Sequence, residues 1–236
     1  MDIYMTQIYN TNARTLTRSR RPYDIFAYIG KVLDNAILVG LSGLGLHSGT
    51  RVLDYGCADQ PYRNLLPQGC DYLGADLFGN PLADIAIAVD GKTSVPDASC
   101  DAVLSTQVLE HVADPTLYLD ECKRVLKPEG KLLLSTHGLM VWHPDPVDRW
   151  RWTGEGLRHM VEKSGLRIVQ FSGIVGLPAT ALWLLQYSIN GKLPWGLRHL
   201  FVIAINGAMS MADRLTSAES KSANALVFIL VAERPT

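Results

Sequence analysis

Short apolar runs of β type alternate with helical segments over residues 51–173, and this alternation constrains the fold more than any other feature. The expected strands are 51–54, 72–76, 84–90, 101–105, 131–136 and 166–171. Helices are expected over 116–126, closed by a turn at 127–130, and over 154–164. Strands that alternate with helices predict an α/β fold, in which a mostly parallel sheet is covered on both faces.

The segments on either side of this region differ from it in composition. Residues 1–21 contain four arginines but no apolar run, so we interpret them as an ordered arm rather than a secretory signal, with only a faint similarity to a transit peptide. Apolar residues then recur near a 3.6-residue period over 25–38 and predict a helix, which the glycines after residue 39 end.

Residues 168–212 are almost free of charge, with Lys192 and Arg198 as their only Lys, Arg, Asp or Glu residues. Helices buried against the sheet are the favoured interpretation. A membrane-spanning helix and a surface that touches lipid through Trp183 and Trp195 stay open. The apolar run 225–232 predicts a last, buried strand. We therefore expect an arm and helix at 1–47, a core at 48–173, an apolar helical cap at 174–215 and a strand at 216–236 that completes the core.

Net charge and cysteine content limit the classes of partner and the cellular compartment that we expect. Lys and Arg total 22 against 23 Asp and Glu, a net charge of −1, and without a basic excess we expect no nucleic-acid partner. The four cysteines (Cys57, Cys70, Cys100, Cys122) lack the spacing of a zinc site. They are typical of reduced thiols, which predicts a cytoplasmic protein.

Acidic residues stand at the ends of three expected strands. Asp54 ends the first strand and Gly56 follows it, a turn at which backbone can approach a ligand closely. Asp76 ends the second strand, where a carboxylate can accept hydrogen bonds from a ribose. Asp90 with Gly91 follows the third and could recognise an adenine amino group. The pattern favours a nucleoside-bearing ligand. An NAD fingerprint is missing, because Ala58 stands where Gly-x-Gly-x-x-Gly requires its second glycine.

Five segments in this order (53–57, 74–76, 95–103, 108–112 and 125–132) resemble class I S-adenosylmethionine-dependent methyltransferases, in the family that includes ubiquinone-biosynthesis methyltransferases. The resemblance implies a doubly wound, mostly parallel, Rossmann-like sheet of seven strands. Its last strand would run antiparallel beside 131–136, and the helical cap would be an addition. It also implies S-adenosylmethionine as cofactor and methyl transfer as activity.

The same resemblance supplies the expected cofactor site. Asp54 and Gly56 would lie at the methionine end of the cofactor, Asp76 at the ribose, and Asp90 and Gly91 near the adenine. The full set of expected cofactor-binding residues is Asp54, Gly56, Cys57, Asp76, Leu77, Asp90, Gly91, Gln107 and His111. Ala58 and Gln60 depart from the family pattern, which often has glycine there, and a left-handed backbone would strain Ala58.

The segment after the fifth strand is dense in histidine, tryptophan, aspartate and arginine. A hydroxyl acceptor must lose a proton, and histidine is the usual base at neutral pH. We expect the base among His143, His137 and His111. A metal is not expected, since the segment offers too few carboxylates for a hard cation.

This segment also resembles methyltransferases from bacterial surface-polysaccharide gene clusters, which share a His-x-x-Pro-x-Asp-x-x-Arg-x-Thr pattern. The expected acceptor-binding residues are Trp142, Asp148, Arg151 and Trp152. Alternatively, Asp148 and Arg151 only fasten the loop, and Thr153 caps the next helix.

The hypothesis from the sequence is O-methylation of a hydroxyl on a sugar, glycan or lipid-linked glycan. Two alternatives stay open: a methyltransferase for an apolar small molecule such as a quinol or polyketide, and a non-catalytic methyltransferase-like partner module. The apolar cap leaves open a homodimer or a peripheral contact with the inner face of the membrane.

Overall fold

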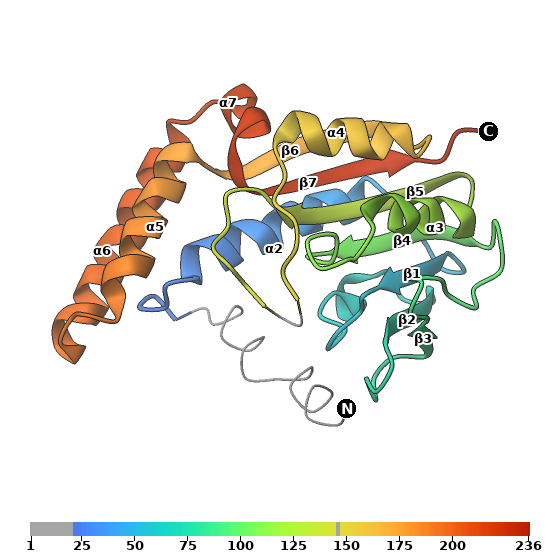
Figure 1. Ribbon diagram of the computed structural model, residues 1–236, viewed down its shortest axis with the longest axis horizontal. Coiled ribbons are helices and arrows are strands. Elements are labelled where there is room, and N and C mark those ends of the chain that lie inside the picture. Colours follow the sequence, from blue (N-terminus) through green and yellow to red (C-terminus); the bar gives the residue numbers. More distant parts are fainter. Residues whose placement is uncertain (1–20, 145–146) are drawn as a thin grey trace.

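A mixed sheet of seven strands forms the centre of the protein, and its strand order is β3-β2-β1-β4-β5-β7-β6 (Figure 1). The computed structural model describes residues 21–144 and 147–236. The strands are β1 (Arg51–Tyr55), β2 (Asp71–Leu77), β3 (Ile85–Ile87), β4 (Cys100–Thr106), β5 (Leu126–His137), β6 (Arg167–Gly176) and β7 (Ala225–Glu233). The helices are α2 (Ala27–Ser42), the short 3-10 turn η1 (Arg63–Leu65), α3 (Pro115–Val125), α4 (Gly154–Lys163), α5 (Leu177–Asn190), α6 (Trp195–Arg214) and α7 (Ala218–Ala223).

Strand directions confirm the expected Rossmann-like methyltransferase topology. β1 pairs in parallel with β2 and β4, β2 with β3, and β4 with β5. β7 inserts antiparallel between β5 and β6, as the sequence predicted for its last apolar run. Because β1, β2, β3, β4 and β5 all point the same way, the loops that follow them meet at one edge of the sheet.

Helices cover both faces of the sheet and give it two hydrophobic cores. α3 and α4 pack on one face through residues such as Leu119 and Leu157, both fully buried. α2 packs on the other face, where Ile37 is fully buried. A Cβ on Gly40 would lie 2.4 Å from Cδ1 of Leu133 on β5, so α2 approaches the sheet too closely there for a side chain. The Thr153 hydroxyl accepts a hydrogen bond from the Gly156 N–H and caps α4, as one interpretation of the sequence held.

Two expected boundaries were wrong. The turn expected at 127–130 is an irregular part of β5, where the register with β4 shifts between Cys100 and Ala102. Glu129 has φ +65° there, and its N–H donates to the carbonyl of Arg234, so backbone pairing continues through the bulge. The third strand is shorter than expected, because Ala88 turns back and its N–H bonds to the carbonyl of Lys92.

The charge-poor segment forms a hairpin of two helices, α5 and α6, which projects from the sheet beside the start of α2 (Figure 1). Trp183 of α5 is fully buried, lies 5.7 Å from Phe26 between ring centroids, and donates a hydrogen bond to the carbonyl of Ile25. The expectation of buried helices is therefore only half right, because the outer face of each helix is exposed. No helix in the described ranges is long and apolar enough to cross a membrane. The division of the chain at 47, 173 and 215 stays a proposal.

Replacing Leu133 by Ala will destabilise the protein by about 2–5 kcal/mol, because it opens a cavity between β5 and α2. Leu133 is fully buried in the core that α2 covers. Leu65→Ala, at a side chain that is 47% exposed, is the control and should change the free energy of unfolding by about 0.5 kcal/mol or less. Urea denaturation measures both, and equal losses would contradict the assignment of this core.

Candidate active site

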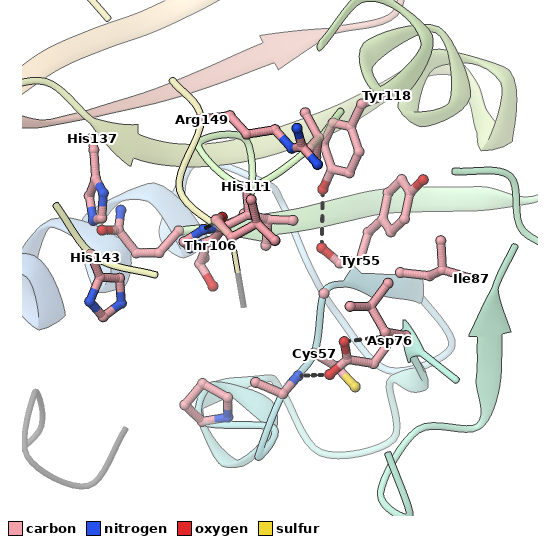
Figure 2. A pocket seen from close by; sticks show the side chains of 18 of the residues that line it. Tyr55, Cys57, Asp76, Ile87, Thr106, His111, Tyr118, His137, His143 and Arg149 are labelled. Atoms are coloured by element: carbon pink, nitrogen blue, oxygen red, sulfur yellow. Dashed lines mark hydrogen bonds between the residues drawn. The ribbon is translucent and has the colours of Figure 1, made fainter. Parts of the chain in front are cut away.

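A cavity of about 640 Å³ opens at the edge where the parallel strands end. It is lined by a residue from the end of each: Tyr55 of β1, Asp76 of β2, Ile87 of β3, Thr106 of β4 and His137 of β5. Figure 2 shows Asp76 and Ile87 at one end of the cavity and His137 with His143 at the other. The ends of open α/β sheets are the usual place for a ligand.

In the turn after β1, the backbone of Gly56 itself forms part of the cavity wall. Gly56 has φ +92°, and a Cβ on it would lie 2.5 Å from Cγ2 of Val108. The N–H groups of Gly56 and Cys57 both donate to the carbonyl of Ala75 on β2, at 2.8 and 2.9 Å. Burial raises the pKa of the Cys57 thiol to about 12, so this side chain lies at the cavity as a neutral thiol. Glycine at position 56 is thus required by both conformation and space.

The Asp76 carboxylate holds the loops after β1 and β2 together. Its Oδ2 accepts from the Ala58 N–H at 2.9 Å and from the Asn80 amide at 2.6 Å, and its Oδ1 accepts from the Leu77 N–H at 2.8 Å. The Asn80 amide also donates to the carbonyl of Ala58 at 2.8 Å. Asp76 is nearly buried yet lines the cavity, so one carboxylate shapes the loop and faces the ligand space. Asn80 was not identified from the sequence, although its place in a turn four residues after Asp76 was a usable signal.

Ala58 and Gln60 adopt left-handed backbone conformations, with φ +51° and +54°. This is the strained case that the sequence left open, and it costs roughly 1–2 kcal/mol per residue. The hydrogen bonds of Asp76 and Asn80 to Ala58 offset part of that cost. The side chain of Gln60 accepts from Arg63 and donates to the carbonyl of Leu82, which ties this residue into the loop as well.

The expected cofactor residues line the cavity with one exception. The cavity walls include Gly56, Cys57, Asp76, Leu77, Asp90, Gly91, Gln107 and His111. Asp54 is not among the described residues that line it. Its carboxylate is 1% exposed and accepts a 2.7 Å hydrogen bond from the Tyr72 hydroxyl on β2. A direct contact of Asp54 with the methionine end of the cofactor stays a prediction.

Three histidines meet at the opposite end of the cavity. The ring centroids of His111, His137 and His143 lie 5.8–6.3 Å apart, and all three residues line the cavity. His111 donates from Nδ1 to the carbonyl of Val147 at 2.6 Å. Burial lowers the pKa of His137 well below its ordinary value, and the positive charge of Arg151 lowers it further, so this imidazole is neutral. The sequence predicted all three histidines but not that they would form one cluster.

Glu110 lies behind the histidines and was not identified from the sequence as a site residue. It is fully buried, with Oε1 3.2 Å from Nε2 of His137 and 4.0 Å from Nε2 of His111. The Thr136 hydroxyl donates to Oε2 at 2.8 Å, whereas neither Oε1 nor Nδ1 of His137 has a hydrogen-bond partner in the described part of the chain. Burial raises the pKa of Glu110 to about 7. A carboxyl with this pKa can exchange a proton at neutral pH.

In the loop that was predicted to bind the acceptor, the charged side chains form hydrogen bonds with other groups of the same loop. Arg151 donates to the Asp148 carboxylate and to the carbonyls of Met140 and Val141. Asp148 also accepts from the His143 N–H at 2.7 Å. Burial alone would raise the pKa of Asp148, but the hydrogen bonds from Arg151 and the His143 N–H, together with the positive charge of Arg151, lower the pKa overall. The loop thus fixes the backbone of His143.

The predicted acceptor-binding side chains lie away from the cavity lining that the structure describes. Trp142 is 74% exposed, and Trp152 stacks on Trp150 with ring centroids 5.9 Å apart. Neither these tryptophans nor Asp148 and Arg151 are among the lining residues, so their role in binding an acceptor stays a prediction. Among the described residues, no group of His, Cys, Asp and Glu could hold a metal ion. Asp145, one of the few carboxylates of this segment, lies outside them.

The sequence analysis did not identify the apolar residues that line the cavity as site residues. Phe26, Ile29 and Leu33 line the cavity from the start of α2, together with Met140 and Val227. The helical period of the first three was visible in the sequence. The sequence did not show, however, that this face of the helix covers the ends of the strands.

Comparison with known proteins identifies the family. A family model described as a methyltransferase domain matches residues 19–170. The chain belongs to this methyltransferase family. It is 32% identical over 172 residues to the ubiquinone biosynthesis O-methyltransferase of Dinoroseobacter shibae, covering 58% of this chain and 68% of the relative. It is thus an S-adenosylmethionine-dependent methyltransferase, and the non-catalytic alternative is not retained. The likeness to polysaccharide-cluster enzymes stays a prediction.

Solved structures agree with this fold. Phosphoethanolamine N-methyltransferase 2 of Haemonchus contortus, in complex with S-adenosyl-L-methionine, has a TM-score of 0.55 and 17% identity, covering 94% of this chain and 60% of that chain. An S-adenosylmethionine-dependent methyltransferase from Aquifex aeolicus also has a TM-score of 0.55, with 14% identity and coverage of 95% and 97%. At these identities the likeness shows the fold alone.

The residues present fit the cofactor. The Gly56 turn leaves a space that a Cβ would fill, and carboxylates of Asp76 and Asp90 stand at the end where a ribose and an amino group would be bound. Among the described residues, the lining of the cavity contains two cations, Lys31 and Arg149, against five aspartates, Asp34, Asp59, Asp76, Asp90 and Asp114. An acidic surrounding suits a cofactor with a positive sulfonium and no phosphate.

S-adenosylhomocysteine will bind with micromolar affinity and NAD will not bind, as measured by calorimetric titration. Asp76→Ala will weaken S-adenosylhomocysteine binding by about tenfold or more, because it removes hydrogen bonds that hold the loops after β1 and β2. The matched control is Asp71→Ala, at an exposed carboxylate near the start of the same strand. If both variants bound equally well, Asp76 would have no part in the site.

Replacing Glu110 by Gln will make stability fall more steeply in acid. The raised pKa of Glu110 adds stability that is fully present below about pH 4.5 and lost as pH rises through about 7. The lowered pKa of His137 acts oppositely, and its contribution is present above about pH 6.5 and lost as pH falls. In the wild type the two effects oppose each other. In the Glu110→Gln variant only that of His137 remains, up to about 1.4 kcal/mol per pH unit.

Urea denaturation between pH 5 and 8 tests this, with Glu155→Gln on the exposed surface of α4 as control. Parallel stability curves for the wild type and the Glu110→Gln variant would show that Glu110 is ionised in the folded protein throughout this range.

Proposed function

We propose that this enzyme methylates a hydroxyl oxygen on an apolar, ring-bearing acceptor such as a quinol. The observation that carries the proposal is the composition of one end of the cavity. Apolar residues at the start of α2 and just before it (Phe26, Ile29, Leu33) line the same cavity as His137 and His143. Such a site excludes water around a flat apolar molecule and offers imidazole groups to its hydroxyls.

The names of the relatives support this acceptor class over a glycan. The curated relative in Dinoroseobacter shibae is named for O-methylation in ubiquinone biosynthesis, as is one in Cereibacter sphaeroides that is 30% identical over 172 residues. A sugar or lipid-linked glycan, the first choice from the sequence, is supported less well. Asp148 and Arg151, the charged side chains expected to bind its hydroxyls, are engaged in holding their own loop.

We assign the proton acceptor to His143. His143 lines the cavity, its backbone is fixed by Asp148, and the structure gives its ring no hydrogen-bond partner among the described residues. An imidazole nitrogen of His143 takes the proton of the acceptor hydroxyl as the oxygen is methylated. His137 and Glu110 form a buried pair beside it, in which His137 is neutral.

The remaining groups bind and align the two reactants. Gly56, Asp76, Asp90 and Gln107 would hold the cofactor, which when bound supplies an electrophilic methyl carbon on a positively charged sulfur. The apolar residues of α2 keep water from the acceptor oxygen. Alignment of two reactants in a dry cavity is the main contribution that methyl transfer needs from a protein.

Replacing His143 by Ala will lower kcat by roughly 10²–10⁴-fold, because the acceptor hydroxyl loses its base. Affinity for S-adenosylhomocysteine should stay unchanged, since His143 lies at the end of the cavity away from Asp76. The assay is methyl transfer to a catechol with a short apolar tail. The control is His159→Ala, on the exposed side of α4.

A set of monosaccharide and glycan acceptors, assayed in parallel, tests the acceptor class. Methyl transfer to sugars but to no catechol would overturn the proposal. Full activity of the His143→Ala variant would contradict the assignment of His143 as the base and would assign that role to another histidine of the cluster. It would not contradict the acceptor class.

A further inference from the structure

The hairpin of α5 and α6 has apolar side chains on its outer side as well as on the side that packs against the protein. On α6, Leu197, Leu200, Ala204, Gly207 and Met211 follow one another at spacings of three or four residues and are all exposed. Leu200 and Met211 are each 67% exposed and Leu197 is 59% exposed. Residues at this spacing lie on one side of a helix, so α6 presents a continuous apolar stripe to its surroundings.

α5 buries the apolar Ala179 and Trp183, but part of its pattern is inverted, with leucines exposed and polar side chains buried. Its leucines Leu184 and Leu185 point outward, 37% and 48% exposed, whereas Thr180 and Gln186 are buried. The Thr180 hydroxyl donates to the carbonyl of Val175, and the Gln186 amide donates to the carbonyl of Ile25. A helix in contact with water normally buries leucine and exposes glutamine. The inversion indicates that the outer face of the hairpin meets an apolar environment.

The charges of this face indicate which environment it is. Between residues 168 and 212 the chain has no Asp or Glu, and its two cations, Lys192 and Arg198, stand at the turn and in the first turn of α6. Trp195 lies between them and is 74% exposed. Tryptophan and basic residues at the border of an apolar face match the headgroup region of a bilayer with anionic lipids.

A second copy of the chain fits this face less well. In a two-fold contact the same surface meets itself, so Lys192 and Arg198 would meet no acidic side chain from the corresponding segment. Phosphate groups of lipids supply the missing negative charge. We propose that the outer face of α5 and α6 docks on the surface of a bilayer that contains anionic lipids, with its apolar stripe in the acyl boundary.

The position of the hairpin agrees with such a contact. It projects from the body of the protein, so nothing drawn from the described chain covers its outer side (Figure 1). Its inner side contacts Phe26 through Trp183, and Phe26 lines the apolar end of the cavity. The docking surface therefore adjoins the cavity without contributing to its walls.

Vesicle flotation with the full chain tests the proposal. The protein should float with vesicles of phosphatidylcholine mixed with phosphatidylglycerol, and less with phosphatidylcholine alone. The double variant Leu200→Glu with Met211→Glu should lower the bound fraction by about tenfold or more, since it puts two charges into the apolar stripe. A Lys192→Ala variant with Arg198→Ala should lose the preference for anionic vesicles. Leu65→Glu, at an exposed leucine outside the hairpin, should bind as the wild type does.

Affinity for S-adenosylhomocysteine, measured on every variant, reports that each has folded. Absence of wild-type flotation, or equal flotation of the double variant, would overturn the proposal. Light scattering in the absence of lipid measures whether the protein forms a dimer through this face. A dimer that the Leu200→Glu and Met211→Glu changes dissociate would assign the face to a second copy of the chain instead.

Discussion

The parallel pairing of β1 with β2 and with β4 is the constraint on which the site depends. Because these strands run in register, the turns after Tyr55, Leu77 and Thr106 emerge at the same edge of the sheet. The cofactor loop is then closed by backbone bonds to Ala75 and by the Asp76 carboxylate. The left-handed residues Ala58 and Gln60 persist in this loop because the bonds around them determine its path.

Burial sets the chemistry at the other end of the cavity. Desolvation disfavours the charged form of each group, so it raises the pKa of Glu110 and lowers that of His137. His137 is therefore neutral and Glu110 is only partly ionised at neutral pH, so the two do not form an ion pair despite a separation of 3.2 Å. This arrangement puts a neutral imidazole, with a carboxyl behind it whose pKa is about 7, next to His143, the imidazole we assign to the reaction.

The hairpin of α5 and α6 shows that the sheet tolerates a long helical connection between two neighbouring strands. It connects β6 to β7, two neighbouring antiparallel strands that a short turn could join, and the strands keep their pairing on either side of it. Extra length in such a connection costs little, because loop-closure entropy grows slowly with length. The inserted helices can therefore have an outer surface unlike that of the core, anchored by Trp183 and by the buried Asp213, which accepts from the Tyr28 hydroxyl.

The sequence by itself determined the order of the main strands and helices, the antiparallel last strand and most of the positions expected to line the cavity, because these depend on local patterns and on their order along the chain. It did not reveal that Asp54 lies beneath the cavity, that Glu110 joins the histidines, or that Arg151 is engaged within its own loop. Those facts depend on contacts between residues such as Glu110 and His137, which lie on different elements and meet only when the sheet is assembled. It also left open which side of α5 and α6 faces outward. An apolar helix can pack with either face, and the contacts of Trp183 and Gln186 with the segment just before α2 show which face α5 buries in the folded protein.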